Sequence, residues 1–286
     1  MTKKPNLPVR LWRKLPFSGA GGALVTHIDL VGTIGPDSRT GRSLNLKKVE
    51  KALDAAFKPK NLQAVAISIN SPGGSPVQSR LIHDRIRLLA AEKKVPVLTF
   101  IEDVGASGGY ILAIAGDEIF ADESSIVGSI GVIAGGFGFV EAIDKLGVDR
   151  RVYTAGKNKS QLDPFQPENK EDIKRFKQML DLTHDIFKGL VKERRGAKLD
   201  EARSEEIFSG QFWIADPAME MGLIDGIGHL RQVIESRYGK DVEIKKIATE
   251  EKSFVAKLLG AKIPGIDSGE IIAGLDEKAH WSRFGL

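Results

Sequence analysis

A serine enclosed by glycines, between two apolar runs, is the feature that most limits what this 286-residue chain can fold into. Residues 105–110 read GASGGY, after an apolar run at 95–101 and before another at 111–115. A strand-to-helix turn of this composition can expose a hydroxyl and lets backbone N–H groups approach a substrate carbonyl. Ser107 is therefore a candidate nucleophile, although serine is also a common N-cap of a helix.

The choice of a base for Ser107 is narrow, because the chain has no histidine between His83 and His184. Lys159 lies in the polar, glycine-containing loop TAGKNKS. A lysine accepts a proton only when it is neutral, so its pKa must be lowered by burial or nearby dipoles. We therefore predict a serine peptidase with Lys159 as its base, whereas Lys157 would point to the other side of an extended loop. Most lysines are surface groups, and a distant histidine in a Ser-His-Asp triad stays open.

A further segment, INSPGGS at 69–75, ends an apolar run and precedes a helical pattern. Its two glycines after a proline allow a sharp turn whose N–H groups point outward together, as an oxyanion hole requires. An ordinary strand-to-helix turn has the same composition, so this segment alone is a weak signal. No Gly-Lys-Ser/Thr follows, which disfavours a phosphate-binding loop.

The composition excludes several kinds of site. The chain has no cysteine, which rules out disulfides, zinc–thiolate centres and cysteine nucleophiles. It has no His-x-x-x-His pair or comparable cluster, so we expect no metal site and no cofactor. With 42% hydrophobic and 28% charged residues, the chain has the composition of a globular protein with a substantial core.

The formal charge of +4 comes from an N-terminal arm, residues 1–22. Five basic residues precede the first acidic one, Asp29, so the rest of the chain carries a formal charge of −1. A basic tail without a basic groove does not indicate nucleic-acid binding. Interleaved apolar residues would allow peripheral contact with an anionic membrane, but a solvated arm is the simpler interpretation. No apolar run has the length of a membrane span or a signal-peptide core, so we expect a cytoplasmic protein.

Strand-like and helix-like patterns alternate through most of the chain. Strands are expected at 24–31, 64–69, 95–101, 118–121 and 151–154, and helices at 77–93, about 167–195 and 230–238. This alternation is typical of an α/β domain with a mainly parallel sheet.

Taken together, four segments resemble the signal peptide peptidase A (SppA) family of serine peptidases. They are INSPGGS at 69–75, GASGGYILAIAGDEIFADESSIVGSIGV at 105–132, YTAGKNKSQLDPF at 153–165 and FSGQFWIADPAMEMGLIDGIG at 208–228. The resemblance implies an α/β fold of the ClpP/crotonase type, a repeated β-β-α superhelix with C-terminal helices. It covers a peptidase domain at 23–240, which follows the arm and precedes a C-terminal extension at 241–286.

The resemblance also implies roles for individual residues. Ser107 matches the family nucleophile and Lys159 the general base. Gly74 and Gly108 match the amides of the oxyanion hole, and Ser129 matches a serine that orients the lysine.

The family further implies the surroundings of this site. We expect Gly73 and Ser75 to line the substrate cleft. Members form dome- or ring-shaped homo-oligomers in which neighbouring subunits, or two repeats of a longer chain, supply the serine and the lysine of one site. The expected substrates are short peptides, signal-peptide remnants or unfolded protein, although members that clear signal peptides usually carry a membrane anchor and this sequence shows none.

Other functions on the same fold remain as alternatives. A crotonase-type acyl-CoA enzyme relies on carboxylates as acid and base, and it would need neither Ser107 nor Lys159. A non-catalytic scaffold that binds peptides or membrane proteins would also not need Ser107 or Lys159. A ClpP-like triad would place a histidine about 25 residues after the serine, whereas Val132 stands there. The paired serine and lysine motifs favour the peptidase.

Overall fold

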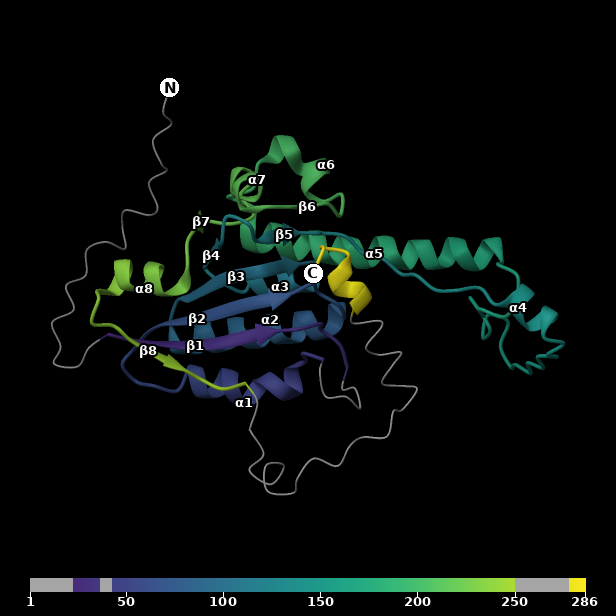
Figure 1. The fold of residues 1–286 in the computed structure, drawn as a ribbon, viewed down its shortest axis with the longest axis horizontal. Helices are drawn as coiled ribbons and strands as arrows, with labels where there is room; N and C mark the ends of the chain where they lie inside the picture. The colour runs from purple at the N-terminus through teal and green to yellow at the C-terminus, as the bar shows by residue number, and fades with distance from the viewer. Residues whose placement is uncertain (1–22, 37–42, 250–277) are drawn as a thin grey trace, which may run out of the picture.

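The structure, a computed structural model, describes residues 23–36, 43–249 and 278–286. The predicted basic arm at 1–22 lies outside these ranges. The described chain forms an eight-stranded sheet with helices on both of its faces (Figure 1). This arrangement confirms the α/β class with a mainly parallel sheet.

The strands run parallel in every pairing except that of β5 with β6. Their order is β6-β5-β3-β2-β1-β8, and β4 pairs with both β3 and β7. The bounds are β1 Leu24–Val31, β2 Leu62–Ser71, β3 Val97–Ala106, β4 Glu118–Ala121, β5 Ile126–Gly128, β6 Phe212–Trp213, β7 Gly226–Ile227 and β8 Glu243–Lys246.

The central strands are apolar at nearly every position because helices cover both faces of the sheet. Helices α1, α2, α3 and α5 share one hydrophobic core with the sheet, whereas α8 packs with Val25, Ala66 and Phe100 on the other face. Strands that are covered on both faces are apolar at nearly every position rather than at alternate ones. The bounds are α1 Leu46–Ala56, α2 Pro76–Lys93, α3 Gly108–Ala113, α4 Val140–Lys145, α5 Lys170–Arg195, α6 Ser204–Ile207, α7 Ala215–Glu220 and α8 Leu230–Tyr238, with a 3₁₀ turn at Glu201–Arg203.

Caps at the helix ends follow from local side chains. The Ser75 side chain accepts a hydrogen bond from the Gln78 amide, and Pro76 occupies the first helical position of α2. The Asn169 side chain caps α5 in the same way, by accepting from the amides of Glu171 and Asp172. The cap at Asn169 starts α5 slightly later in the chain than the expected position near residue 167.

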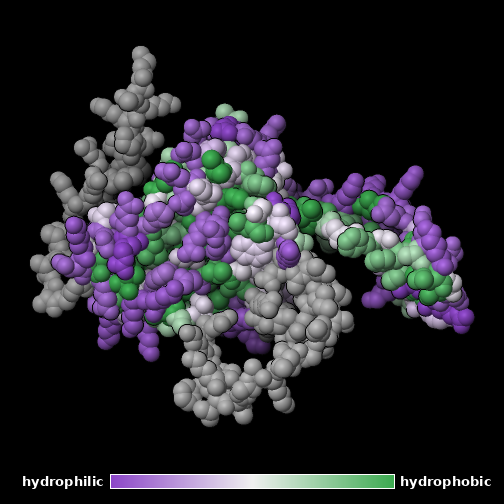
Figure 2. Space-filling model, in the orientation of Figure 1, coloured by the Kyte–Doolittle hydropathy of each residue, from purple (hydrophilic) through white to green (hydrophobic). Residues whose placement is uncertain are grey.

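The segment at 132–169, called here the protruding arm, extends away from the sheet beside the N-terminal half of α5 (Figure 1). The strand predicted at 151–154 is wrong for this chain, because these residues form no strand. No other strand of the described residues lies beside them to supply hydrogen-bond partners. The arm exposes apolar side chains at its tip, as Figure 2 shows, and Phe137 and Tyr153 are 81% and 90% exposed.

Residues after 240 also pack on this sheet. Strand β8 pairs with β1, and Phe284 is buried near the end of β3. The domain division proposed from the sequence remains a prediction. No helix in the described ranges combines the length and the apolar character that crossing a membrane requires.

Candidate active site

Ser107 occupies a strained backbone position between β3 and α3. Its φ is 53° and its ψ is −121°, a conformation that residues with a side chain rarely adopt. Its side chain makes no capping hydrogen bond to α3. Ser107 thus stands at the N-cap position of α3, but its side chain does not cap the helix, and the turn has the strand-to-helix form that exposes a nucleophile.

Hydrogen bonds of the backbone fix this turn. The Ser107 amide donates to the carbonyl oxygen of Gly128 at 2.8 Å, which ties the turn to the end of β5. The Ser107 carbonyl oxygen accepts from the amides of Tyr110 and Ile111, at 2.9 and 3.1 Å. These bonds fix the backbone of Ser107, whereas its hydroxyl makes no hydrogen bond to α3.

Glycines let three segments approach at this point. A side-chain Cβ at Gly109 would lie 2.3 Å from the carbonyl oxygen of Ser71, and one at Gly108 would lie 2.4 Å from Ser79 Oγ and 3.2 Å from the Gly74 nitrogen. Contacts this short exclude any larger residue unless the backbone moves. The glycine-rich turns after β2 and β3 therefore pack backbone against backbone.

The amides of Gly74 and Gly108, which the family resemblance assigns to an oxyanion hole, lie close together at the Ser107 turn. They come from two turns 34 positions apart in the sequence, and the contacts above bring those turns together. Within the described part of the chain, neither amide donates to an acceptor. Two free N–H groups beside a serine hydroxyl are the donors that stabilise a tetrahedral intermediate.

A cleft of about 530 Å³ opens beside this turn. Ser107, Gly108, Gly74 and Ser75 line it, together with apolar side chains of α3 and α5 that include Ile111. Gly73 is not part of the lining. It lies beneath the nucleophile instead, where a Cβ on Gly73 would be 2.8 Å from the Ser107 Cβ.

Lys159 is not beside Ser107 in the single chain. It is exposed on the protruding arm, and it does not line the cleft. Ser129, in contrast, directly follows Gly128, whose carbonyl binds the Ser107 amide. Ser129 is 5% exposed, has a φ of 53° and donates its amide to the carbonyl oxygen of Gln211 at 2.6 Å. Within the described residues, Ser129 makes no hydrogen bond to a lysine.

The cleft also contains a histidine that the sequence did not single out. His280, near the C-terminus, lines the same cleft as Ser107, as does Arg283. The C-terminal residues return to the sheet through Phe284, which packs against Val104 and Ala106. No sequence motif predicts that the C-terminal residues pack on the sheet. The only local signal is the presence of apolar residues near the C-terminus.

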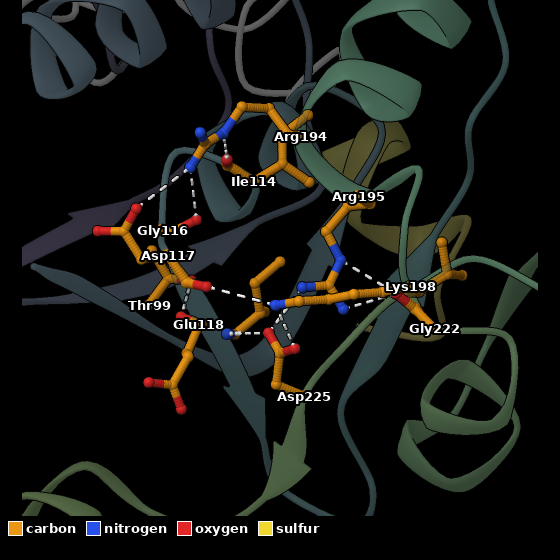
Figure 3. Close-up of polar contacts among 12 residues, drawn as sticks. Thr99, Ile114, Gly116, Asp117, Glu118, Arg194, Arg195, Lys198, Gly222 and Asp225 are labelled. Atoms are coloured by element: carbon orange, nitrogen blue, oxygen red, sulfur yellow. Dashed lines mark hydrogen bonds and ion pairs between the residues drawn. The ribbon is translucent and has the colours of Figure 1, made fainter. Parts of the chain in front are cut away.

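A buried ion pair joins the C-terminal end of α5 to Asp225, just before β7 (Figure 3). Arg195, at the end of α5, is 3% exposed and donates to Asp225 Oδ2 at 2.6 Å and to the Gly222 carbonyl oxygen. Lys198 Nζ contacts the other oxygen of Asp225 at 2.6 Å. Burial alone would raise the pKa of Asp225, but Arg195 and Lys198 outweigh it and hold this pKa below its ordinary value.

Two further contacts join the same region to α3. The Tyr110 hydroxyl donates to the Leu223 carbonyl oxygen at 2.7 Å, and complete burial raises the pKa of Tyr110 well above its usual range. Arg194 donates to the carbonyl oxygens of Ile114 and Gly116, just after α3 (Figure 3). Helix α3, which starts at the nucleophile, is therefore anchored along its length. The sequence patterns did not predict this network.

Comparisons with known proteins agree with this description. The model of peptidase family S49 matches residues 90–245. The chain is 48% identical over 283 residues to a Na(+)/H(+) antiporter NhaA of Brucella abortus, covering 92% of this chain and 38% of that protein. It is 29% identical over 245 residues to the chloroplastic serine protease SPPA of Arabidopsis thaliana, covering 85% of this chain and 35% of that protein. The chain thus spans little more than a third of the length of these relatives.

A solved structure shares the fold. A 1510-N membrane-bound stomatin-specific protease aligns with a TM-score of 0.50 and 15% identity, covering 80% of this chain and 99% of that one. The fold and the strained serine define an α/β protein of ClpP-like architecture with a candidate site centred on a serine. The chain belongs to peptidase family S49. The resemblance to the SppA family is confirmed by this match.

Proposed function

We propose that this chain hydrolyses peptide bonds with Ser107 as nucleophile and Lys159 as general base. The observation that carries the proposal is the turn at Ser107, where a strained serine with an uncommitted hydroxyl lies beside the free amides of Gly74 and Gly108. The S49 match, over residues 90–245, includes both the serine and the lysine.

The proposed reaction passes through an acyl-enzyme. Neutral Lys159 Nζ takes the proton of the Ser107 hydroxyl while Oγ attacks the scissile carbonyl carbon. The amides of Gly74 and Gly108 donate to the resulting oxyanion. Lys159 then gives its proton to the leaving amine as the C–N bond breaks. Water, deprotonated by the same lysine, releases the acyl group and restores Ser107.

We propose that Lys159 comes from a neighbouring copy of the chain. The lysine lies on the protruding arm, outside the cleft of its own subunit. Exposed apolar side chains on the same arm, such as Phe137 and Tyr153, have the character of an interface that a second copy covers. Docking of the arm beside a neighbour's Ser107 and Ser129 would remove Lys159 from solvent and place it within reach of the nucleophile.

The proposed substrates are short peptides, signal-peptide remnants and unfolded protein. A cleft between the sheet and α5 with apolar walls suits an extended, apolar segment. Ion transport belongs to the longer antiporter relatives, of which this chain matches only 38%, and it is not part of this proposal.

Hydrolysis of casein and of fluorogenic peptides tests the chemistry. Wild type is expected to cleave, with a rate that rises from about pH 6 toward pH 10 as the lysine becomes neutral. Ser107→Ala and Lys159→Ala are expected to lose activity by about a thousandfold or more. Lys157→Ala is the matched control, because it removes a neighbouring lysine from the same loop and should stay active. His280→Ala should stay active too, since otherwise the base is a histidine of the same chain.

Mixing the two inactive variants tests the shared site. If the lysine is supplied by a neighbour, co-assembly of Ser107→Ala with Lys159→Ala restores activity at about a quarter of the sites in a random mixture. If both groups act within one subunit, the mixture stays inactive and the shared-site proposal fails. Wild type that neither cleaves any substrate nor reacts with a serine-directed probe would overturn the peptidase proposal itself.

A further inference from the structure

Among the described residues, the cleft beside Ser107 is lined by basic side chains and by no acidic ones. Arg80, His280 and Arg283 line it, and none of the other described lining residues is Asp or Glu. The rest of the lining is backbone and mostly apolar side chains. These basic side chains would disfavour the binding of a purely apolar peptide, because each cation would lose its water without gaining a partner.

Arg80 and Arg283 differ in whether a carboxylate of the chain already pairs with them. Arg80 Nε donates to both carboxylate oxygens of Asp84, at 2.8 and 2.9 Å. Arg283 has no carboxylate partner among the described residues, and its guanidinium carbon lies 5.8 Å from the centre of the Phe284 ring. Arg283 is exposed, so its donors are available to a ligand in the cleft.

The C-terminal segment at 278–286 brings Arg283 to this place. Phe284 is 8% exposed and packs with Val104 and Ala106, the latter immediately before Ser107. Its ring also meets the ring of Phe212 edge to face, with 5.1 Å between the ring centres. The anchor of Arg283 and the nucleophile are therefore attached to the same end of β3.

We infer that Arg283 makes the cleft selective for peptides that carry a carboxylate, either an acidic side chain or a free C-terminus. A guanidinium binds a carboxylate through two parallel N–H···O bonds, which gives both affinity and orientation. This inference deepens the proposed function and rests on it, since the peptide must occupy the cleft beside Ser107. The apolar walls hold the rest of the peptide, and Arg283 selects which peptide is held.

Binding of labelled peptides to the full-length Ser107→Ala variant tests the inference without hydrolysis. Fluorescence anisotropy compares apolar peptides that differ only in glutamate against glutamine, and a second set that differs only in a free against an amidated C-terminus. We expect about a three- to tenfold tighter Kd for the carboxylate form in one of the two sets. The set that responds identifies the source of the carboxylate, and added salt should reduce the preference.

Substitutions of Arg283 assign the preference to this side chain. In the same Ser107→Ala background, Arg283→Ala is expected to remove the preference, Arg283→Lys to keep part of it, and Arg283→Glu to favour a lysine-bearing peptide instead. Lys278→Ala is the matched control, because Lys278 is an exposed cation of the same segment that does not line the cleft. Phe284→Ala should also reduce the preference, since it removes the anchor of the segment.

Equal binding of acid and amide in both peptide sets would overturn the inference. A preference that survives Arg283→Ala would overturn it as well. The proposed function is tested separately, by measuring hydrolysis with the chain in which Ser107 is intact. Absent hydrolysis with an Arg283-dependent binding preference would refute the peptidase but leave the carboxylate selection in place.

Discussion

The Ser107 amide donates to the carbonyl oxygen of Gly128 at 2.8 Å, and this bond joins the start of α3 to the end of β5. Residue 107 and the residue that follows Gly128, Ser129, both have a φ of 53°. Two serines with unfavourable backbone conformations thus lie at adjoining strand ends. Strain of this kind persists only where the surrounding structure enforces it, and it commonly marks a functional site.

Substitution of Gly74 is expected to disrupt the site. Its φ is 136°, and a Cβ there would lie 2.0 Å from the carbonyl oxygen of Ile34. Gly74→Ala should therefore lower the free energy of unfolding by about 3 kcal/mol or more, and it should abolish hydrolysis. Urea unfolding and peptidase assays measure the two effects. Gly135→Ala is the control, because a Cβ at Gly135 meets nothing within 4 Å, and wild-type stability in both variants would contradict the packing described here.

Loss of the Tyr110 hydroxyl is expected to loosen α3. Tyr110→Phe removes the 2.7 Å hydrogen bond to the Leu223 carbonyl oxygen and leaves that buried acceptor unpaired. The expected cost in the free energy of unfolding is about 1–3 kcal/mol. Tyr153→Phe removes a hydroxyl from a side chain that is 90% exposed, and it should change stability little. Equal unfolding midpoints for the two variants would show that the Tyr110 bond contributes nothing.

The Arg195–Asp225 pair is expected to be costly to break. Asp225→Asn leaves a guanidinium that is 3% exposed without its anionic partner, so the free energy of unfolding should fall by about 3–5 kcal/mol. Asp149→Asn breaks the exposed pair with Arg151 and serves as the control, with an expected change near zero. Because the folded pKa of Asp225 is lowered, its contribution is present above the unfolded pKa and is lost as the pH falls through the folded value.

His83 is expected to make stability depend on mildly acidic pH. Its side chain is buried on α2 with Nδ1 2.8 Å from Asp84, and burial lowers its pKa below 6.5 despite Asp84, with Arg194 and Arg80 acting in the same direction as burial. The unfolded chain therefore binds the proton first, so stability falls as the pH drops below about 6.5 toward the folded pKa.

Urea unfolding of wild type and His83→Gln, at several pH values between about 5 and 8, measures this dependence. The variant should lose part of the slope below about pH 6.5. His229→Gln controls for the loss of a histidine, since the His229 side chain is 72% exposed. An unchanged slope in His83→Gln would assign the acid sensitivity to other groups.

Most of the local elements could be predicted from the sequence. The predicted helix at 230–238 has the observed bounds of α8, and the strand at 24–31 those of β1. Periodicity and caps act within a few residues, so they are readable without the fold. The glycine-flanked serine at 107 was identified for the same reason, since a turn of this composition is a local property.

Which of these parts come into contact depends on the packing of the whole chain. The sheet order brings the turn after β2 against the turn after β3, so the amides of Gly74 and Gly108 become neighbours. The same fold leaves Lys159 on the protruding arm and returns Arg283 to the cleft, although neither position follows from local pattern. Contacts between distant segments depend on which surfaces are buried together, and this is settled by the packing of the whole chain rather than by the propensity of any one segment.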